Sequence, residues 1–294
     1  MWNDGFIAVD WGTTNRRAYS IDTAGVVVDQ MEDDRGVSSL TVGSFPNAVA
    51  EIRQRMGERP LLLAGMVGSN RGWREAPYVP CPARLGDLVA RLEWVETGRV
   101  AIVPGLSIVE GETGDVMRGE EVQVFGLLGQ LRESKPHTIC HPGTHTKWIA
   151  LQEDAIAGFR TVMTGEIFAL LRKHSILAPL LKADPAVGPS FLRGVERGFA
   201  HGELSAELFA VRARVLLSLM EESEAASYAS GLLIGCDLRA GLSMHSGGEI
   251  VVLGTPTLTR LYAQALRHCG QMAREADGAT AFVAGMVAIK EKLG

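Results

Sequence analysis

One pattern of residues occurs twice in this 294-residue chain, and it limits the folds that the sequence can adopt. In FIAVDWGTTNRRAYSI (6–21), an apolar run ends on Asp10, a Gly-Thr-Thr turn follows, and a second alternating run begins. In HTICHPGTHTKWIALQ (137–152), a Gly-Thr turn again separates two runs of strand-forming residues. Such runs around a turn predict paired β-strands. The chain therefore reads as two related halves, each opening on a strand–turn–strand unit.

Strand and helix patterns alternate after each of these units. The alternation predicts an α/β fold of two related ribonuclease H-like halves, with mixed sheets flanked by helices and an active-site cleft between them. We place the halves at residues 1–136 and 137–294. The expected further strands are 26–31, 61–65, 99–105 and 249–254, and the expected helices are 46–56, 86–95, 116–131, 256–269 and 279–293, with long helical stretches between 191 and 244.

The composition excludes several classes of function. The net charge of -5, the pI near 5.8 and the lack of clustered Lys and Arg argue against nucleic acid as a partner. No apolar run reaches the 18 residues of a membrane span. The four cysteines are far apart and form no CxxC pair, which is typical of reduced thiols in the cytoplasm. We expect a cytoplasmic protein.

The repeated turns suit phosphate binding. Glycine lets the backbone approach a ligand closely, and successive amide groups and threonine hydroxyls form an anion-binding nest. Asp10, at the end of the strand before the first nest, can hold Mg²⁺. The alternative is an ordinary hairpin with a buried, hydrogen-bonded Asp10. The predicted nest residues are Gly12, Thr13 and Thr14 in the first turn, and Gly143, Thr144, His145, Thr146 and Lys147 in the second.

A zinc site is a rival interpretation of the second turn, because His137, Cys140, His141 and His145 lie close together in the sequence. Neighbouring strand residues point to opposite faces, so Cys140 and His141 cannot both face one ion. No second cluster completes a ligand set. We instead expect His145, together with Lys147, to face the terminal phosphate of a nucleotide.

A third turn, in VVLGTPTLTRLY (251–262), ends a buried strand on Gly254 and Thr255 and begins a helix with Pro256. Amide groups at this helix start can contact a nucleoside. A plain strand-to-helix connection would have the same pattern. The motifs GxxxxGK[ST] and GxGxxG are both absent, so neither of those phosphate cradles is used.

These motifs together carry a resemblance. DWGTT, PGTHTK and VLGTPT look like the two phosphate motifs and the adenosine motif of the actin, sugar kinase and Hsp70 superfamily. More closely, AVDWGTTNRRAY, AGMVGSNRGWREAPYVPCPA, VMRGEEVQ, PGTHTKW, FRTVMTGE and SGLLIG resemble the 2-dehydro-3-deoxygalactonokinases nearly end to end. The resemblance implies an ATP-dependent kinase, for which Mg²⁺ at Asp10 would be the metal cofactor. It implies phosphorylation of the 6-hydroxyl of 2-dehydro-3-deoxy-D-galactonate, in galactonate catabolism.

The loop GMVGSNRGW (65–73) has groups that suit a sugar acid. It follows a buried strand at the end where α/β sheets place ligand loops. Ser69 and Asn70 offer polar partners and Trp73 a flat apolar face, although a plain surface turn with Trp73 in the core fits the same residues. Arg71 or Arg74 offers a cation for the carboxylate of the sugar acid. Arg118 is a further cation that can meet the substrate, because it lies close in sequence to Glu120, the expected catalytic base.

The resemblance also implies a catalytic base. Sugar kinases of the superfamily carry an acid at the start of the helix before the second phosphate motif, often after a glycine. In MRGEEVQVFG (117–126) that acid is Glu120. Glu121 points about 100° further round the helix, so only one of the two should face the substrate. Asp115 is a third candidate, and both glutamates could instead serve the helix dipole.

Other activities fit parts of the pattern. An ATPase switch of the same fold would share the nests, and a sugar sensor would keep the polar loop without turnover. The gluconate-derived epimer, 2-dehydro-3-deoxygluconate, differs from the expected substrate in one hydroxyl, and the sequence does not separate the two. Nor does it fix the oligomeric state, for which a homodimer is the common default among soluble enzymes.

Overall fold

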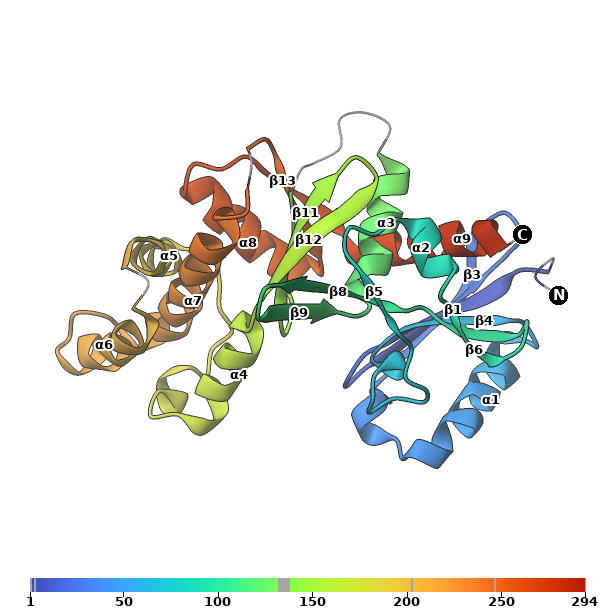
Figure 1. The fold of residues 1–294 in the computed structure, drawn as a ribbon. Coiled ribbons are helices and arrows are strands. Elements are labelled where there is room, and N and C mark those ends of the chain that lie inside the picture. The colour runs from blue at the N-terminus through green and yellow to red at the C-terminus, as the bar shows by residue number, and fades with distance from the viewer. Residues whose placement is uncertain (1, 3, 132–137, 202, 246, 294) are drawn as a thin grey trace. The chain divides into compact units, whose positions relative to one another are not determined.

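The computed structural model describes residues 2, 4–131, 138–201, 203–245 and 247–293. Contacts divide the chain into two compact units, shown in Figure 1. Unit 1 comprises residues 1–135, 152–158 and 278–294, and unit 2 comprises 136–151 and 159–277. The first change of unit falls within 132–137, outside the described residues, as does His137. Within the described residues, no helix is long and apolar enough to cross a membrane.

Unit 1 is built on a six-stranded mixed sheet of order β3-β2-β1-β4-β7-β6. β1 pairs antiparallel with β2 and parallel with β4, so the strand–turn–strand unit lies beside a parallel strand. β7 continues the parallel part. The strands are β1 (Phe6–Trp11), β2 (Arg16–Ile21), β3 (Val27–Asp33), β4 (Leu61–Gly65), β6 (Glu93–Glu96) and β7 (Val100–Ile102).

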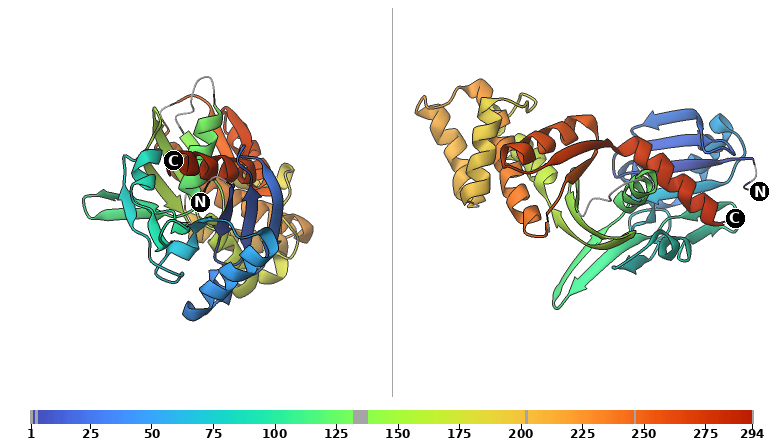
Figure 2. Two further views of the ribbon diagram at one scale, coloured as in Figure 1. Left: turned by 90° about the vertical axis from the view of Figure 1, so that its right-hand side faces the viewer. Right: turned by 90° about the horizontal axis from the view of Figure 1, so that it is seen from above.

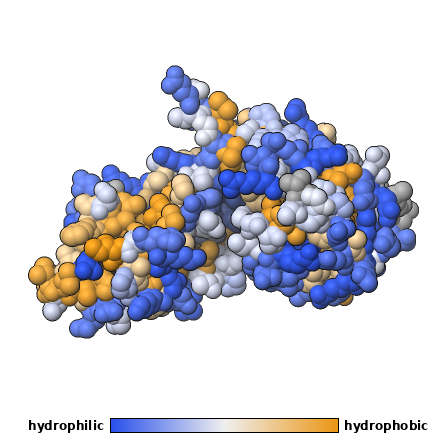
Figure 3. Space-filling model, turned by 90° about the horizontal axis from the view of Figure 1, so that it is seen from below, coloured by the Kyte–Doolittle hydropathy of each residue, from blue (hydrophilic) through white to orange (hydrophobic). Residues whose placement is uncertain are grey.

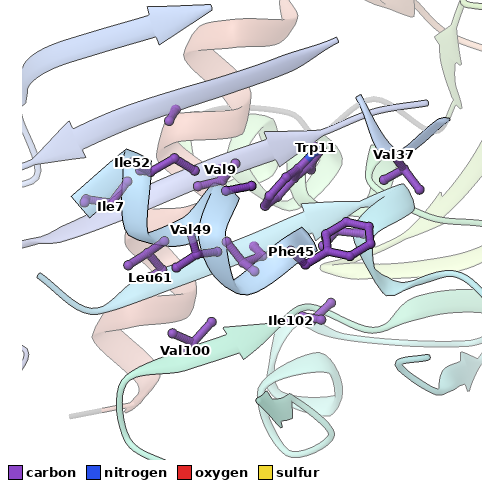
Figure 4. Packing of buried hydrophobic residues seen from close by; sticks show 14 of the residues in the cluster. Ile7, Val9, Trp11, Val37, Phe45, Val49, Ile52, Leu61, Val100 and Ile102 are labelled. Atoms are coloured by element: carbon purple, nitrogen blue, oxygen red, sulfur yellow. The ribbon is translucent and has the colours of Figure 1, made fainter. Parts of the chain in front are cut away.

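One face of this sheet is covered by α1 (Phe45–Met56). Alternate residues of a strand share a face, so Ile7, Val9 and Trp11 all point to the same side. Figure 4 shows them packed with Phe45 and other apolar residues of α1. Burial of one such side chain contributes roughly 1.5–3 kcal/mol. This packing holds β1 in place, and with it the turn that follows Trp11.

Two helices pack against each other in the same unit, α3 (Glu120–Gln130) and α9 (Gly278–Leu293). Glycines make a close crossing possible. A methyl group at Gly126 would lie 1.8 Å from the carbonyl oxygen of Ala281, and one at Gly285 would lie 2.1 Å from that of Val122. The last helix, seen beside β1 in Figure 2, therefore belongs to unit 1. The division expected from the sequence, at residue 136, had placed this helix in the second half.

Two helices expected from the sequence are partly strands. The expected helix at 86–95 is only α2 (Leu85–Val89), because Glu93–Glu96 pairs antiparallel with β7 as β6. The expected helix at 116–131 begins later, as α3, because Gly119 adopts a φ of 111° that breaks the helix. The residues before it form a small sheet of β5 (Tyr78–Pro80), β8 (Gly105–Glu110) and β9 (Thr113–Met117).

Unit 2 repeats the plan with a five-stranded sheet of order β12-β11-β10-β13-β14. β10 pairs antiparallel with β11 and parallel with β13, as β1 does with β2 and β4. The strands are β10 (Thr138–His141), β11 (Thr146–Gln152), β12 (Ala155–Val162), β13 (Ile250–Gly254) and β14 (Ala273–Asp277). The helices are α4 (Thr164–His174), α5 (Pro189–His201), α6 (Leu204–Leu216), α7 (Ala225–Leu242) and α8 (Pro256–His268).

The crossing of α3 and α9 gives a first prediction. Gly126→Ala should lower the free energy of unfolding by about 2 kcal/mol, because the added methyl group forces two backbones apart. Gly129→Ala is the matched control on the same helix, since a methyl group there meets no atom within 4 Å. It should raise stability by up to about 1 kcal/mol. Urea denaturation measures both, and equal effects would contradict the close crossing.

Candidate active site

The first turn is held rigidly by backbone hydrogen bonds. The amide of Gly12 donates to the carbonyl of Asn15 at 2.9 Å, and the amides of residues 36–38 donate to the carbonyls of Gly12, Thr13 and Thr14 at 2.9–3.0 Å. The turn's acceptors are thus occupied. The amides of Thr13 and Thr14 have no partner among the described residues, and both residues are exposed. The turn can offer these donors to an anion.

Asp10 lies at the end of β1 with its carboxylate beside Gly65 of β4. A methyl group at Gly65 would lie 3.5 Å from Oδ1 of Asp10. The pKa of Asp10 is raised to about 6, chiefly by burial; the positive charge of Arg17 opposes the rise, and the negative charges of Glu120 and Glu32 add to it. Two negative groups therefore lie near Asp10, and a bound cation would stabilise its ionised form.

The two glutamates at the start of α3 differ in their surroundings. Glu120 is partly exposed, and its Oε2 accepts a hydrogen bond of 3.1 Å from the amide of Arg118. Glu121 is fully buried, and both of its oxygens lie within 2.8 Å of the amide of Gly119. Burial, with the charge of Glu120, raises the pKa of Glu121 to about 8. Of the three candidate bases, Glu120 combines partial exposure with proximity to Asp10, whereas Glu121 is buried and Asp115 lies on β9.

The polar loop after β4 folds back on itself. Ser69 is buried, and its hydroxyl donates to the carbonyl of Met66 at 2.7 Å and accepts from the amide of Arg71 at 3.2 Å. Asn70 is exposed. Trp73 is stacked on Phe45 with ring centroids 6.3 Å apart, and it packs against the core. One face of Trp73 is therefore used in packing, and Asn70 is an accessible polar residue of the loop.

Arg118 connects the start of α3 to this loop. Its Nη2 donates to the carbonyl of Ala76 at 2.8 Å, and its guanidinium lies 4.3 Å from the ring centroid of Tyr78. A methyl group at Gly68 would lie 2.9 Å from Nη1. Its Nε and Nη1 are buried and have no hydrogen-bond partner among the described residues. Two donors of this cation thus lack an acceptor, which is costly in a protein interior.

The other two arginines of the loop are placed differently. Arg74 contacts β6, where its Nη1 lies 3.4 Å from Glu93 and 3.3 Å from the carbonyl of Trp94. Arg71 is exposed. The structure therefore brings Arg118 to the loop from a different part of the sequence and directs Arg74 away to β6.

The second turn lies against the start of α4. The ring of His145 is 2.5 Å from the carboxylate of Glu166, and the amide of Glu166 donates to the carbonyl of Thr144 at 2.9 Å. A methyl group at Gly165 would lie 2.3 Å from the carbonyl oxygen of Gly143. The turn and the amino-terminal end of a helix therefore meet, and helix amino termini favour anions.

Two residues expected in this turn lie on β11. Thr146 is fully buried, with its hydroxyl 2.8 Å from that of Tyr262. Lys147 is 5% exposed, and its ammonium donates to the hydroxyl of Thr161 on β12 at 2.8 Å. The strand begins one residue after His145, so the side chains of Thr146 and Lys147 lie on opposite faces of the sheet. Gly143, Thr144 and His145 are the accessible residues.

Asp237 anchors this region and was not expected from the sequence. It is buried on α7 and accepts hydrogen bonds from Trp148 at 2.7 Å, Thr164 at 2.5 Å and Tyr262 at 2.5 Å. Burial raises its pKa, and these hydrogen bonds oppose that rise. The network joins β11, α4, α7 and α8. An acid inside the apolar run SGLLIGCDL was the signal available in the sequence.

The third turn lies next to the second. β10 and β13 are parallel, so their carboxyl ends meet at one edge of the sheet. A methyl group at Gly254 would lie 3.5 Å from the carbonyl oxygen of Pro142. Thr255 is exposed, and α8 begins at Pro256. Within unit 2, the phosphate-type turn, the start of α4 and the start of α8 thus lie at the same edge.

The zinc interpretation gains no support. Cys140 is fully buried on β10, and its pKa is raised well above the usual thiol value, mainly by burial. Across the described ranges, no three His, Cys, Asp or Glu side chains are grouped so that they could hold a metal ion. A magnesium ion held by one carboxylate and phosphate oxygens needs no such group.

The burial of Glu121 gives a prediction for pH. Its pKa in the folded state is above the usual value of 4.5, so the unfolded state ionises first as pH rises. The stability that this group contributes is complete below about pH 4.5 and is lost as pH rises through about 8. Glu121→Gln should remove this loss. Between pH 5 and 8, its unfolding free energy should therefore fall by less than that of the wild type, by on the order of 3 kcal/mol.

Urea denaturation at several pH values measures the difference. The exposed Glu222→Gln serves as the control and should follow the wild type. Parallel pH profiles for Glu121→Gln and the wild type would contradict a buried, neutral Glu121.

Known structures confirm the expected fold class. The activator of 2-hydroxyisocaproyl-CoA dehydratase from Clostridium difficile, solved with ADPNP bound, superposes with a TM-score of 0.53 over 98% of this chain and 95% of its own. Component A of the Acidaminococcus fermentans (R)-2-hydroxyglutaryl-CoA dehydratase gives 0.55 over 98% of each chain. Both are 11% identical to this chain and show the fold alone, an actin-like ATPase fold.

Closer relatives identify the family. A crystal structure from Sinorhizobium meliloti, assigned as a 2-dehydro-3-deoxygalactonokinase, is 31% identical and gives a TM-score of 0.88, covering 98% of this chain and 99% of its own. The 2-dehydro-3-deoxygalactonokinase of Escherichia coli K12 is 36% identical over 289 residues, 97% of each chain. The family model described as 2-keto-3-deoxy-galactonokinase matches residues 10–289. The chain therefore belongs to the 2-keto-3-deoxy-galactonokinase family.

Proposed function

We propose that this sugar-acid kinase transfers the γ-phosphoryl group of ATP to the 6-hydroxyl of 2-dehydro-3-deoxy-D-galactonate, a cytoplasmic step of galactonate breakdown. One observation carries the proposal. In unit 1, Glu120 lies near enough to Asp10 for its charge to raise the pKa of Asp10, where β1, β4 and the start of α3 meet. Two neighbouring acids suit phosphoryl transfer, in which one acid orients the acceptor and another serves a metal ion.

Glu120 acts as the base. The substrate hydroxyl donates its hydrogen bond to the carboxylate and loses its proton to it as the oxygen bonds to the γ-phosphorus. The bond from that phosphorus to the β–γ bridging oxygen breaks, and ADP leaves with the electron pair. The partly exposed carboxylate of Glu120 suits this role, whereas that of Glu121 is buried against Gly119.

Asp10 is the magnesium-side acid. Asp10 is half-buried, and burial and two negative neighbours, Glu120 and Glu32, disfavour its ionised form against the favourable charge of Arg17. A divalent cation would reverse that balance. When bound, Mg²⁺ neutralises charge on the phosphates of ATP. In the turn after Trp11, Gly12 lets the backbone approach the phosphates closely, and Thr13 and Thr14 supply amide groups.

Unit 2 holds the donor. The amides and side chains of Gly143, Thr144 and His145 contact the phosphates, and the start of α4 adds its positive helix end. Gly254 and Thr255 lie next to that turn and contact the nucleoside. The nucleotide analogue bound to the Clostridium difficile activator of the same fold supports a nucleotide donor. Thr146 and Lys147 follow the turn on β11, and their contact with ATP stays a prediction.

The polar loop and Arg118 receive the sugar acid. Ser69 holds the loop in shape through its hydrogen bond to Met66, and Asn70 offers an amide to the sugar. Trp73, stacked on Phe45, offers its other face to the sugar. Arg118 contributes a cation whose Nε and Nη1 lack acceptors among the described residues, and a substrate carboxylate is an acceptor of suitable charge.

A coupled assay for ADP release tests the function. We expect release that requires both ATP and the sugar acid, with a higher kcat/KM for the galactonate-derived substrate than for its gluconate-derived epimer. Hydrolysis of ATP without the sugar would indicate an ATPase switch. Binding of the sugar without turnover would indicate a sensor. Equal kcat/KM for the two epimers would contradict the substrate and leave the kinase activity standing.

The role of Glu120 is tested by a pair of variants. Glu120→Gln should lower kcat by about 10²–10⁴-fold, the usual contribution of a general base, with ATP affinity nearly unchanged. Glu121→Gln, next to it in the chain, is the matched control and should have a mild effect. The reverse pattern would move the role to Glu121, and two mild variants would remove it from this helix. Steady-state kinetics and nucleotide titration separate these outcomes.

A further inference from the structure

α6 has two apolar faces, although it lies at the surface of unit 2. Its inner face packs Leu208, Val211 and Val215 into a core cluster with residues of α4 and α7. The opposite face forms a second stripe, spanning an arc of about 120° at 100° per residue. We call it the outer stripe, and it consists of Ala206, Phe209, Ala210, Ala213, Leu216 and Leu217.

The outer stripe is exposed. Phe209 is 62% exposed, Leu216 68% and Leu217 69%, and Leu219, just beyond the helix, is 72% exposed. Figure 3 shows hydrophobic residues gathered over the end of unit 2 that carries α6. With side chains of about 150–200 Å² each, the stripe and Leu219 expose on the order of 500 Å² of apolar surface. Isolated exposed apolar residues are ordinary, but a continuous stripe of this size marks an interaction site.

The helix does not fit a lone surface helix or a membrane-surface helix. A surface helix of a monomer has one apolar face and one polar face. A membrane-surface helix needs a polar face rich in Lys and Arg opposite its apolar one. Opposite the outer stripe, α6 has the packed inner face. Its charged residues include Glu207, paired with Arg197 at 2.6 Å, and Arg214, which lies 4.9 Å from the ring of Tyr228.

We propose that the outer stripe is the interface of a homodimer and that its partner is the same stripe of a second copy of this chain. The stripe combines large side chains with Ala206, Ala210 and Ala213, so it presents both projections and hollows. A face of that kind can pack against itself in a two-fold arrangement. It contains no charged residue, as expected at the centre of an interface between permanent partners.

The exposed area is also adequate. A standard interface buries about 800 Å² on each partner, of which roughly 56–65% is apolar. That corresponds to about 500 Å² of apolar surface per copy, which is what the stripe and Leu219 offer. The chain therefore carries the apolar part of a complete interface on one helix and its carboxyl-terminal turn.

Light scattering on the full-length protein at micromolar concentration tests the proposal. We expect a particle of twice the 31.6 kDa chain mass. Phe209→Glu and Leu217→Glu should each give a particle of one chain mass, with kinase turnover close to that of the wild type. Met272→Glu places the same charge on another exposed apolar residue of unit 2, 66% exposed, and should leave the dimer intact.

A cross-link tests the same interface without a charge in the stripe. Ala213→Cys should form a disulfide-linked dimer under mild oxidation, while the wild type, with its four free cysteines elsewhere, should not. A wild-type monomer would overturn the proposal, as would a dimer that survives both glutamate variants or Ala213→Cys that fails to cross-link. Sedimentation of a wild-type monomer with phosphatidylcholine and phosphatidylserine vesicles would instead identify a lipid surface as the occupant. If the glutamate variants fail to fold, the cross-link decides.

Discussion

The site in unit 1 depends on how closely three backbone segments approach one another at the end of β1. Gly65 and Gly119 have φ angles of 91° and 111°, which side chains rarely adopt. A methyl group at Gly65 would lie 2.8 Å from the carbonyl oxygen of Trp11, and one at Gly119 would lie 3.2 Å from Cα of Gly65. Only glycine permits this contact. Because the segments touch, the first residue of α3 lies beside the last residues of β1, and Glu120 comes within electrostatic reach of Asp10.

Each unit has an acid whose pKa is raised by burial, and the surroundings of the two acids differ. Asp237 receives three hydrogen bonds from side chains on three elements, so its charge is compensated and it fixes the second turn. Asp10 has two negative neighbours, Glu120 and Glu32, which oppose the compensation of its charge by Arg17. An acid of the first kind supports structure, whereas one of the second kind is typical of functional sites. The two turns are similar in sequence, but this difference between the acids indicates a structural role for Asp237 in unit 2 and a chemical role for Asp10 in unit 1.

Local patterns predicted much of the fold and less of the site. The repeated strand–turn–strand units were predicted because alternation and turn residues act over a few positions, and β1, β2, β10 and β11 all form. The features that were wrong or missed depend on distant partners. Glu93–Glu96 is a strand because β7 lies beside it, α9 joins unit 1 because Gly126 and Gly285 let it cross α3, and Lys147 turns to Thr161 because β12 is its neighbour. No local pattern contains those partners.

Two features of the site in unit 1 have an energetic cost that its proposed ligands would offset. Folding brings Asp10 near Glu120 and Glu32, and it encloses Nε and Nη1 of Arg118 without acceptors among the described residues. Each feature lowers the stability of the empty protein. A cation bound at Asp10 would offset the negative charge there, and an anion bound at Arg118 would accept hydrogen bonds from its unpaired donors. A metal–nucleotide complex and a sugar acid therefore match the charges that the fold leaves uncompensated. The same two defects would be hard to explain in a protein selected for stability alone.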